Sequence, residues 1–376
     1  MNLTRIKAIA RKEFIQVWRD PRSLGLAIAL PMVMLVLFGY ALTLDVDNVP
    51  MVVWDQDQSP ASQEYILNFS QSPYFKIIGY SDNYNDLYRH IDRNRAIMAL
   101  VIPPDFAGQL ASDRAAPVQL LVDGSDSNTA TIALGYASAV TALHNRKLVT
   151  DRLAGLGVKS ILPVDMRSRV WFNQDLKSRN FIIPGLIAVI MMVIAALLTS
   201  LTVAREWERG TMEQLISTPI KPRELVIGKI IPYFAIGLVD VLIAVLMGEF
   251  IFDVPLNGSV ILLFALSSLF LVGVLGLGIL ISIVTKKQLL ASQLALVSTF
   301  LPAFLLSGFV FSIANMPTVI RAVTYVIPAR YFVTILKGIY LKGIGLEVLG
   351  IEALLLCLFT LAVLNLAVMM FRKRVV

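Results

Sequence analysis

The residue types that most often carry bond chemistry in proteins are scarce in this chain. The single cysteine, Cys357, cannot form an intramolecular disulfide or a thiolate metal cluster. The two histidines, His90 and His144, do not stand in any Cys, His and carboxylate pattern with metal-ligand spacing. Asp55 and Asp57 match a fragment of a calcium loop, but the rest of that loop is missing, so a helix-capping turn is favoured. The sequence therefore predicts no catalytic constellation and no metal site.

Nucleotide hydrolysis is not expected of this chain either. No Gly-x-x-x-x-Gly-Lys-Ser/Thr motif is present to cradle phosphates, and the nearest approach, residues 155–160, has the wrong spacing. We therefore expect no ATPase site and no bound cofactor in this chain.

One acidic residue stands inside a strongly apolar stretch. Asp240 is expected near the middle of a membrane helix, where an ionisable group is a functional candidate by default. A proton or ion relay normally needs several such groups, so a hydrogen bond across the helix bundle is the favoured role for Asp240. The scarcity of buried charge favours a hydrophobic or amphipathic cargo over a small ion.

The amino-acid composition indicates the class of protein in which these residues occur. Of 376 residues, 57% are hydrophobic and 16% are charged, against about 45–50% and about 25% in ordinary soluble domains. These values exclude a soluble enzyme and a disordered protein, and they indicate a membrane protein.

Six stretches have the roughly 20 apolar residues that a helix needs to cross a hydrocarbon core of about 30 Å. They cover residues 23–44, 181–203, 226–252, 260–285, 289–311 and 346–371. The first is longer than the apolar region of a signal peptide, and no small-residue cleavage site follows it. We predict an α-helical membrane protein with six transmembrane helices.

A long polar insert, residues 45–180, separates the first two of these helices. Apolar, β-branched runs alternate in it with helical patterns. The expected strands are Pro50–Trp54, Phe75–Gly79, Ala96–Ile102 and Val118–Val122, and the expected helices are Ser59–Ser70, Asp82–Arg93, Pro104–Ser112 and Asp126–Leu156. This pattern predicts an inserted α/β domain with a sheet of about four strands.

The distribution of charge predicts the orientation in the membrane. The termini, the loop 204–225 with Lys229, and the Lys286–Lys287 turn together carry 16 Lys and Arg residues, whereas the opposite short loops carry four. The positive-inside rule makes the first side cytoplasmic, so the N- and C-termini, including the tail 372–376, are predicted there and the α/β insert outside. The net charge of +7 is therefore a topology signal, and nucleic acid is excluded as a partner.

Two cytoplasmic segments have patterns typical of contact surfaces. Residues 1–22 place Leu3, Ile6, Phe14 and Trp18 at helical spacing among basic residues, which predicts an amphipathic helix on the membrane surface. The loop 204–225 alternates charge and can begin a new short helix after Gly210 that ends before Pro219. Docking to a soluble partner and a solvated loop with weak salt bridges are both compatible with this pattern.

The sequence of this loop resembles a known family. Arg205–Leu215, followed by Ser217-Thr218-Pro219, resembles the signature loop of ABC-2-type permeases, the membrane subunits of ATP-binding-cassette exporters. The resemblance covers the whole chain, and the segments Leu306–Phe309 and Pro328–Tyr331 are similar to the family's fifth helix and the re-entrant segment after it, here 312–345. The external domain makes the chain similar to permeases of multidrug-type bacterial exporters.

The resemblance implies partners and site residues. It implies a separate cytoplasmic ABC ATPase subunit that binds ATP and Mg²⁺, a second permease copy or paralogue, and a location in the bacterial inner membrane; a periplasmic adaptor is a further candidate partner. The ATPase-docking and coupling residues would be Arg205, Glu206, Trp207, Glu208, Arg209, Gly210, Thr211, Met212 and Glu213. Among these, Glu206, Arg209 and Glu213 are the expected polar contacts, and Trp207 is expected to pack.

The resemblance also points to a cargo path between two permease subunits. Met191, Phe300 and Phe304 are candidates to line it, with core or lipid-facing positions as the alternative. Gly273, Gly276 and Gly278 are expected to pack within the chain.

Three functional hypotheses follow. The first is an exporter permease for a hydrophobic or amphipathic cargo. The second is a membrane-anchored sensor or scaffold with a ligand-binding external domain, against which the small cytoplasmic part argues. The third is a secondary transporter, which the lack of an internal repeat disfavours.

Overall fold

The computed structural model describes the whole chain except residues 1, 43–47, 113, 156–170, 174–176 and 372–376. The chain forms two compact units: residues 1–44 with 170–376, called the membrane unit, and residues 45–169, called the α/β unit. The predicted tail 372–376 and residues 156–160 lie outside the described residues.

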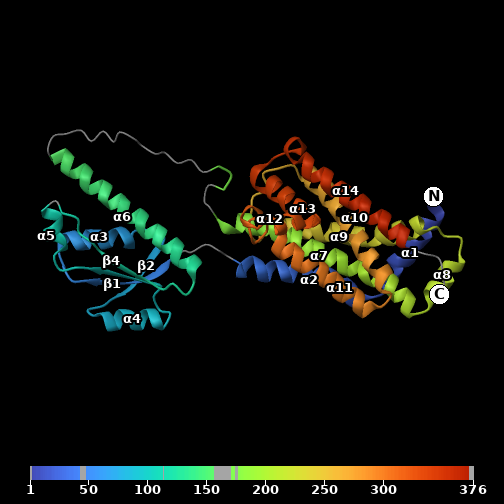
Figure 1. Cartoon of the computed structure of the whole chain (residues 1–376), viewed down its shortest axis with the longest axis horizontal. Helices are drawn as coiled ribbons and strands as arrows, with labels where there is room; N and C mark the ends of the chain where they lie inside the picture. Colours follow the sequence, from blue (N-terminus) through green and yellow to red (C-terminus); the bar gives the residue numbers. More distant parts are fainter. Residues whose placement is uncertain (1, 43–47, 113, 156–170, 174–176, 372–376) are drawn as a thin grey trace. The chain divides into compact units, whose positions relative to one another are not determined.

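The α/β unit is built on a four-stranded sheet of order β2-β1-β3-β4 (Figure 1). The strands are β1 (Val49–Asp55), β2 (Phe75–Tyr80), β3 (Met98–Ile102) and β4 (Gln119–Val122). β1 pairs in parallel with β2 and with β3, whereas β4 runs antiparallel to β3. Every residue of β3 is buried, as expected for an inner strand that is covered on both faces. The four predicted strands are confirmed.

Helices cover both faces of this sheet. They are α3 (Pro60–Ser70), α4 (Tyr84–Asp92), α5 (Phe106–Ala111) and α6 (Ser127–Gly155). α3, α5 and α6 share one hydrophobic core with the sheet, and Leu87 of α4 packs with Val52 and Val101 on the other face. Asp55 accepts hydrogen bonds from the Ser62 hydroxyl and from two backbone N–H groups of the turn before α3, so the predicted helix-capping turn is confirmed.

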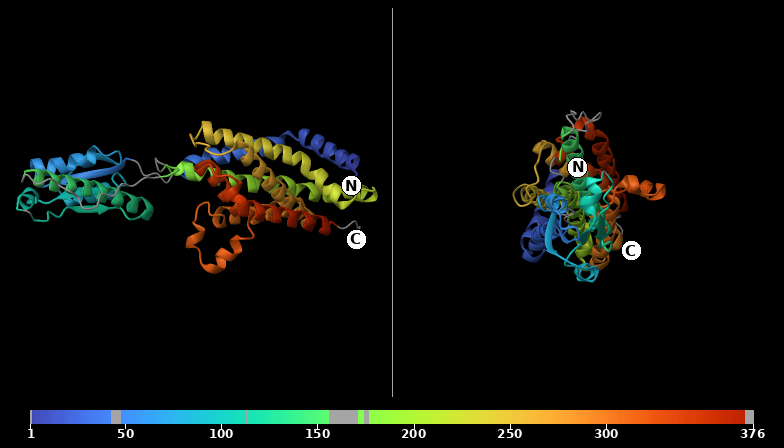
Figure 2. Two further views of the ribbon diagram at one scale, coloured as in Figure 1. Left: turned by 90° about the horizontal axis from the view of Figure 1, so that it is seen from above. Right: turned by 90° about the vertical axis from the view of Figure 1, so that its left-hand side faces the viewer.

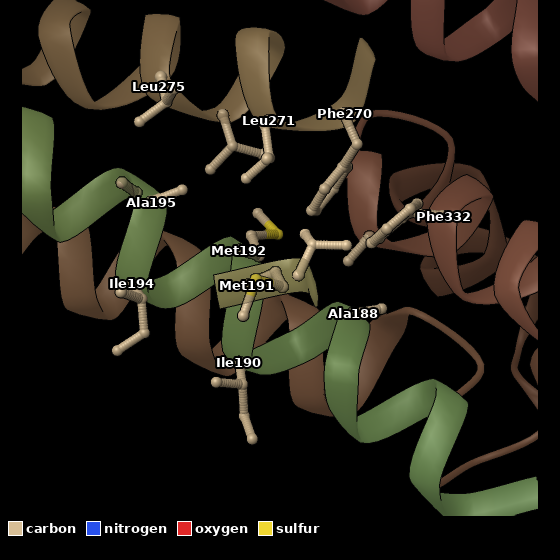
Figure 3. Packing of buried hydrophobic residues seen from close by; sticks show 14 of the residues in the cluster. Ala188, Ile190, Met191, Met192, Ile194, Ala195, Phe270, Leu271, Leu275 and Phe332 are labelled. Atoms are coloured by element: carbon tan, nitrogen blue, oxygen red, sulfur yellow. The ribbon is translucent and has the colours of Figure 1, made fainter. Parts of the chain in front are cut away.

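The membrane unit is helical throughout its described part. Its long helices are α1 (Leu3–Trp18), α2 (Pro21–Ala41), α7 (Ser178–Glu208), α9 (Pro222–Phe250), α10 (Val260–Thr285), α11 (Gln288–Leu306) and α14 (Leu346–Met370). α7 lies at the centre, in contact with α2, α9, α10 and α11. Its residues Met191 and Met192 are enclosed in the packing seen in Figure 3, which also includes Phe270 of α10.

Five described helices are long and apolar enough to cross a membrane: α7, α9, α10, α11 and α14. The predicted first span corresponds to α2, in which Ala27–Ala41 is apolar among the residues with described side chains. The 21 residues of α2 together extend about 30 Å at 1.5 Å per residue, which is the thickness of a hydrocarbon core.

Short broken helices follow α11. They are the 3₁₀ turn η1 (Ile313–Asn315), α12 (Thr318–Thr324), α13 (Pro328–Lys337) and the π-helical turn η2 (Gly338–Lys342). α12 and the segment Pro328–Lys342 meet at a bend of 82°, a geometry that fits either a broken membrane span or the predicted re-entrant segment. In Figures 1 and 2, α12 and α13 lie at one end of the membrane unit, and α1, with the last turn of α14, lies at the other.

Several predicted boundaries were wrong. α7 continues to Glu208, five residues into the predicted loop 204–225, because no helix breaker stands before Gly210. α11 ends at Leu306 instead of residue 311, because Gly308 adopts a positive φ of 82° and turns the chain. The α/β unit ends at residue 169, and residues 178–180, predicted within the insert, belong to α7.

Close helix contacts are made at glycine positions, as predicted. A Cβ at Gly278 would lie 2.1 Å from Thr199 Oγ1 of α7, and one at Gly273 would lie 2.5 Å from Thr360 Oγ1 of α14. Gly276 likewise faces α14. These glycines let the backbones of α7, α10 and α14 approach one another.

Candidate coupling site

A short surface helix, α8 (Thr211–Ser217), follows α7 after a sharp turn. Gly210 makes this turn with a φ of 69°, a left-handed conformation that costs other residues about 1–2 kcal/mol. α8 ends before Thr218 and Pro219, so the predicted short helix between Gly210 and Pro219 is confirmed.

One side of α8 packs inward and the other faces solvent. Met212 is fully buried, and Leu215 and Ile216 pack beside it against the main hydrophobic core. The exposed side consists of Thr211, Glu213, Gln214 and Ser217. α8 is therefore anchored in the hydrophobic core by its apolar side and exposes a polar side to solvent.

Four charged side chains from three helices meet beneath α8. This charge cluster consists of Lys12 and Glu13 of α1, Glu206 of α7 and Lys229 of α9. Lys229 Nζ lies 2.7 Å from Glu13 Oε1 and 3.1 Å from Glu206 Oε1. Lys12 Nζ lies 3.1 Å from Glu13 Oε1 and also pairs with Glu206. The two carboxylates thus share two ammonium groups, and the cluster is neutral as a whole.

The charge cluster is almost completely removed from water. Lys229 is 0% exposed, Glu13 is 2% and Glu206 is 4%, whereas Lys12 reaches the surface. Burial alone would favour the neutral acid, but the charges of Lys229 and Lys12 outweigh it and lower the pKa of Glu13 below its usual range. Burial opposes the charged form of Lys12 too, and the two glutamates nonetheless raise its pKa. Both shifts favour the charged forms of Lys12 and Glu13.

The same contacts fix α1 against α9. Ile9 of α1 lies so close to Gly228 that a Cβ there would be 2.8 Å from Ile9 Cβ. The buried side of α1 is formed by Ile6, Ile9 and Glu13, whereas Phe14 and Trp18 are exposed. The exposed Phe14 and Trp18 agree with an apolar face turned to the membrane surface, whereas the burial of the charged residue Glu13 was not predicted.

A second carboxylate joins the first residues of α1 and α9. Glu224 is buried and accepts hydrogen bonds from the backbone N–H of Asn2 at 2.8 Å and of Lys221 at 3.0 Å. Arg5 Nη1 lies 3.6 Å from the same carboxylate. Glu224 thereby satisfies N–H groups at the start of both helices, where a negative charge is stabilised.

The end of α7 is also tied to the start of α11. Glu208 accepts a hydrogen bond from the backbone N–H of Gln288 at 2.8 Å and another from its side-chain amide. Lys286 Nζ lies 4.7 Å from the ring centroid of Trp207, which packs against the core as predicted. These contacts tie the end of α7, which directly precedes α8, to the start of α11.

The nine predicted coupling residues separate into three groups. Glu208, Arg209, Gly210, Thr211 and Glu213 are exposed, Arg205 and Trp207 are half-buried, and Glu206 and Met212 are buried. Glu206, predicted as a polar docking contact, is buried, and its Oε1 pairs with Lys12 and Lys229, so its side chain does not reach the surface here.

The three candidates for the cargo path differ in how far their side chains are buried. Met191 is 2% exposed inside the core around α7, so it does not line an open path here, and the core alternative holds for it. Phe300 and Phe304 are half-buried on α11 and stack with ring centroids 5.6 Å apart. Phe304 also meets Phe309 edge-on at 5.8 Å.

Asp240 is buried on α9, and its Oδ1 has no hydrogen-bond partner among the described residues. It lines a small cavity with Pro31 and Met32 of α2. The predicted hydrogen bond across the bundle is therefore not formed by this oxygen.

Three members of the charge cluster, Lys12, Glu13 and Lys229, were missed as site residues. Lys229 was counted as an interfacial charge that reports topology, although it stands inside the hydrophobic run of α9. The rule that an ionisable residue within a membrane helix marks a functional position would have identified it.

Comparison with known proteins gives a consistent result. Residues 21–369 match the family model described as ABC-2 family transporter protein. The chain is 42% identical over 338 residues to the "Probable multidrug ABC transporter permease YbhS" of Escherichia coli (strain K12), covering 90% of this chain and 88% of that protein. It is 30% identical over 340 residues to the "Probable multidrug ABC transporter permease YbhR" of the same organism, covering 90% of each. It is also 23% identical to "ABC transporter G family member 20" of Dictyostelium discoideum, over 89% of this chain and 46% of that protein.

Proposed function

The chain belongs to the ABC-2 family of transporter permeases, multi-pass membrane proteins that associate with an ATP-binding subunit, and on this premise we propose that it is the membrane half of an exporter driven by a separate ATPase. The cargo is hydrophobic or amphipathic, a drug-like compound or a lipid. The apolar character of the helices supports this class over a small ion, because Asp240 is the one acid in the middle of a long apolar helix among the described residues.

The observation that carries the proposal is the attachment of α8 to a bundle of fixed helices. Met212 anchors α8 in the hydrophobic core, and the neighbouring charge cluster joins α7, which directly precedes α8, to α1 and α9. A surface helix can transmit force only if it is held in this way. The exposed polar face of α8, with Glu213 and Gln214, is free to contact the ATPase. Closure of two ATPase subunits on ATP would move α8 and the attached helices as one body and switch access to the cargo path.

Charge distribution supports the orientation of this arrangement. α1, α8 and the last turn of α14 lie at the same end of the membrane unit (Figure 1), where most of its basic residues are found. We place this end in the cytoplasm of a bacterial cell and the α/β unit outside its inner membrane. With α2 as the first span, the chain crosses the membrane six times.

Dimerisation completes the transporter. α11 exposes a row of large apolar side chains, among them Leu290, Leu294 and Leu301. Such a face suits contact with a second permease, identical or a paralogue, as well as with lipid. Phe300 and Phe304 on the same helix are candidates to meet the cargo between the two subunits.

The proposal is tested by reconstitution. The purified chain in liposomes should show no ATP hydrolysis by itself, and vanadate-sensitive hydrolysis should appear when its cognate ATPase is added. Hydrolysis by the lone chain would contradict the proposed division of labour.

Docking through α8 is tested by charge reversal with a matched control. Glu213 is exposed in the first turn of α8, and Glu347 is exposed in the first turn of α14, whose start lies at the other end of the unit. Glu213→Arg should abolish co-purification of the ATPase and leave the melting temperature unchanged, whereas Glu347→Arg should change neither. Normal ATPase binding by Glu213→Arg would remove α8 as the docking element.

A further inference from the structure

An apolar cavity opens beside the charge cluster. Its volume is about 230 Å³, and side chains of α1, α2, α7 and α9 line it. Leu30, Leu198 and Leu201 form much of the wall, and Tyr233 closes the side next to the cluster. An apolar cavity of about 150 Å³ already accommodates benzene, so this one has room for a segment of a hydrocarbon chain.

Arg205 stands at the polar edge of this cavity. It also lines a second, polar groove of about 370 Å³ together with Lys12, Arg209 and Thr211. The guanidinium therefore separates an apolar compartment from a polar one, which is the arrangement that an amphiphile with a chain and a charged head requires.

The charges around Arg205 favour an anionic head. Lys12, Lys229, Glu13 and Glu206 balance one another within the cluster. Arg205 and Arg209 are further cations along the groove, and Asp20 is the one further acid at the cavity, so the residues that line the two compartments carry a net positive charge. A guanidinium that is half removed from water is well suited to pair with a phosphate group.

The surroundings of the cavity identify the source of such a ligand. Val17 of α1 lines the cavity, and its neighbours Phe14 and Trp18 are 51% and 68% exposed with their rings stacked. Exposed aromatic side chains on an amphipathic helix are typical of insertion into the interfacial layer of a bilayer. The cavity therefore lies at the depth where phospholipid chains begin.

We propose that this cavity binds an acidic phospholipid, with one acyl chain among Leu30, Leu198 and Leu201 and the phosphate at Arg205. The hydroxyl of Tyr233 interacts with Glu13, so the lipid contacts the charge cluster through one residue. The lipid composition of the inner leaflet thereby affects the charge cluster, which lies close to α8. This site does not depend on an ATPase partner and is measured without one.

The test is native mass spectrometry of the detergent-purified full chain, titrated with dioleoyl phosphatidylglycerol or dioleoyl phosphatidylethanolamine. The wild type should retain phosphatidylglycerol in preference to phosphatidylethanolamine. Arg205→Gln should weaken phosphatidylglycerol binding about ten-fold, since a hydrogen bond to a charged group contributes roughly 1.5–3 kcal/mol. Leu201→Trp, which fills the cavity, should weaken binding of both lipids.

Two matched variants control for charge and size. Arg223 is exposed on α9 outside both cavities, and Leu242 is exposed on the same helix; Arg223→Gln and Leu242→Trp should bind as the wild type does. Unchanged phosphatidylglycerol binding by Arg205→Gln, or equal retention of both lipids by the wild type, would overturn the proposal. Displacement of the lipid by an equal concentration of oleate would also overturn it, because the cavity would then be a site for soluble amphiphiles.

Discussion

Replacement of Lys229 by methionine tests whether the charge cluster holds the coupling site together. The substitution keeps a long side chain of similar shape but removes the ammonium group between Glu13 and Glu206. Two buried carboxylates then share the single charge of Lys12, which is 46% exposed. The variant should therefore lose contact between α1, α7 and α9.

The distances give the size of the effect. At an effective dielectric constant of about 20, unit charges 2.7 and 3.1 Å apart attract each other by roughly 5–6 kcal/mol before desolvation is subtracted. Removing one partner of a buried ion pair costs about 3–5 kcal/mol, because the remaining charge stays unpaired. With ~2–4 °C per kcal/mol for a unit of this size, the melting temperature should fall by about 6–20 °C.

The assay is thermal unfolding of the detergent-purified chain, followed by ATPase stimulation in liposomes. Lys7→Met is the matched control, because Lys7 is an exposed lysine on α1 outside the cluster, and it should melt as the wild type does. Adding Glu13→Gln to Lys229→Met should restore part of the lost stability by removing one unpaired charge. A Lys229→Met variant with the wild-type melting temperature would refute the idea that the cluster stabilises the unit.

Three further predictions concern the same unit. Gly278→Ala should lower the free energy of unfolding by about 1–3 kcal/mol in a denaturation series, because its Cβ would overlap Thr199. Gly210→Ala should cost about 1–2 kcal/mol and reduce ATPase stimulation at constant expression, since its φ of 69° turns the chain into α8. Lys229 lowers the pKa of Glu13 in the folded state. The ionised Glu13 therefore stabilises the fold above the ordinary glutamate pKa of about 4.3, and this stabilisation is lost as the pH falls through the lower pKa of the folded state. The difference in melting temperature between the wild type and Glu13→Gln should accordingly be constant near neutral pH and shrink in acid; a difference that grows in acid would contradict this sign.

The sequence allowed most elements to be located because their signals are local. Hydrophobic length marked the long helices, and alternation of β-branched runs with helical patterns located β1 to β4. Gly210 and Pro219 bracketed α8 because each residue has a backbone preference that stops a helix. Boundaries failed where such a signal was absent, as at the end of α7.

The charge cluster could not be predicted in the same way. Glu13 and Lys229 are separated by 216 positions, and neither residue's own neighbourhood shows that the other lies beside it. The positive-inside count treated Lys229 as one basic residue among many, whereas its pairing depends on the packing of Ile9 against Gly228. The same reason explains Glu206, whose partners Lys12 and Lys229 are far from it in the sequence.

The separation of Glu13 from Lys229 has a consequence for biosynthesis. A ribosome adding ~5–20 residues per second needs about 10–40 s to make the 216 residues between them. During that interval Glu13 has no Lys229 to pair with, so the charge cluster can form only after α9 has been made. A chain that ends before α9 leaves the carboxylates of Glu13 and Glu206 with Lys12 alone.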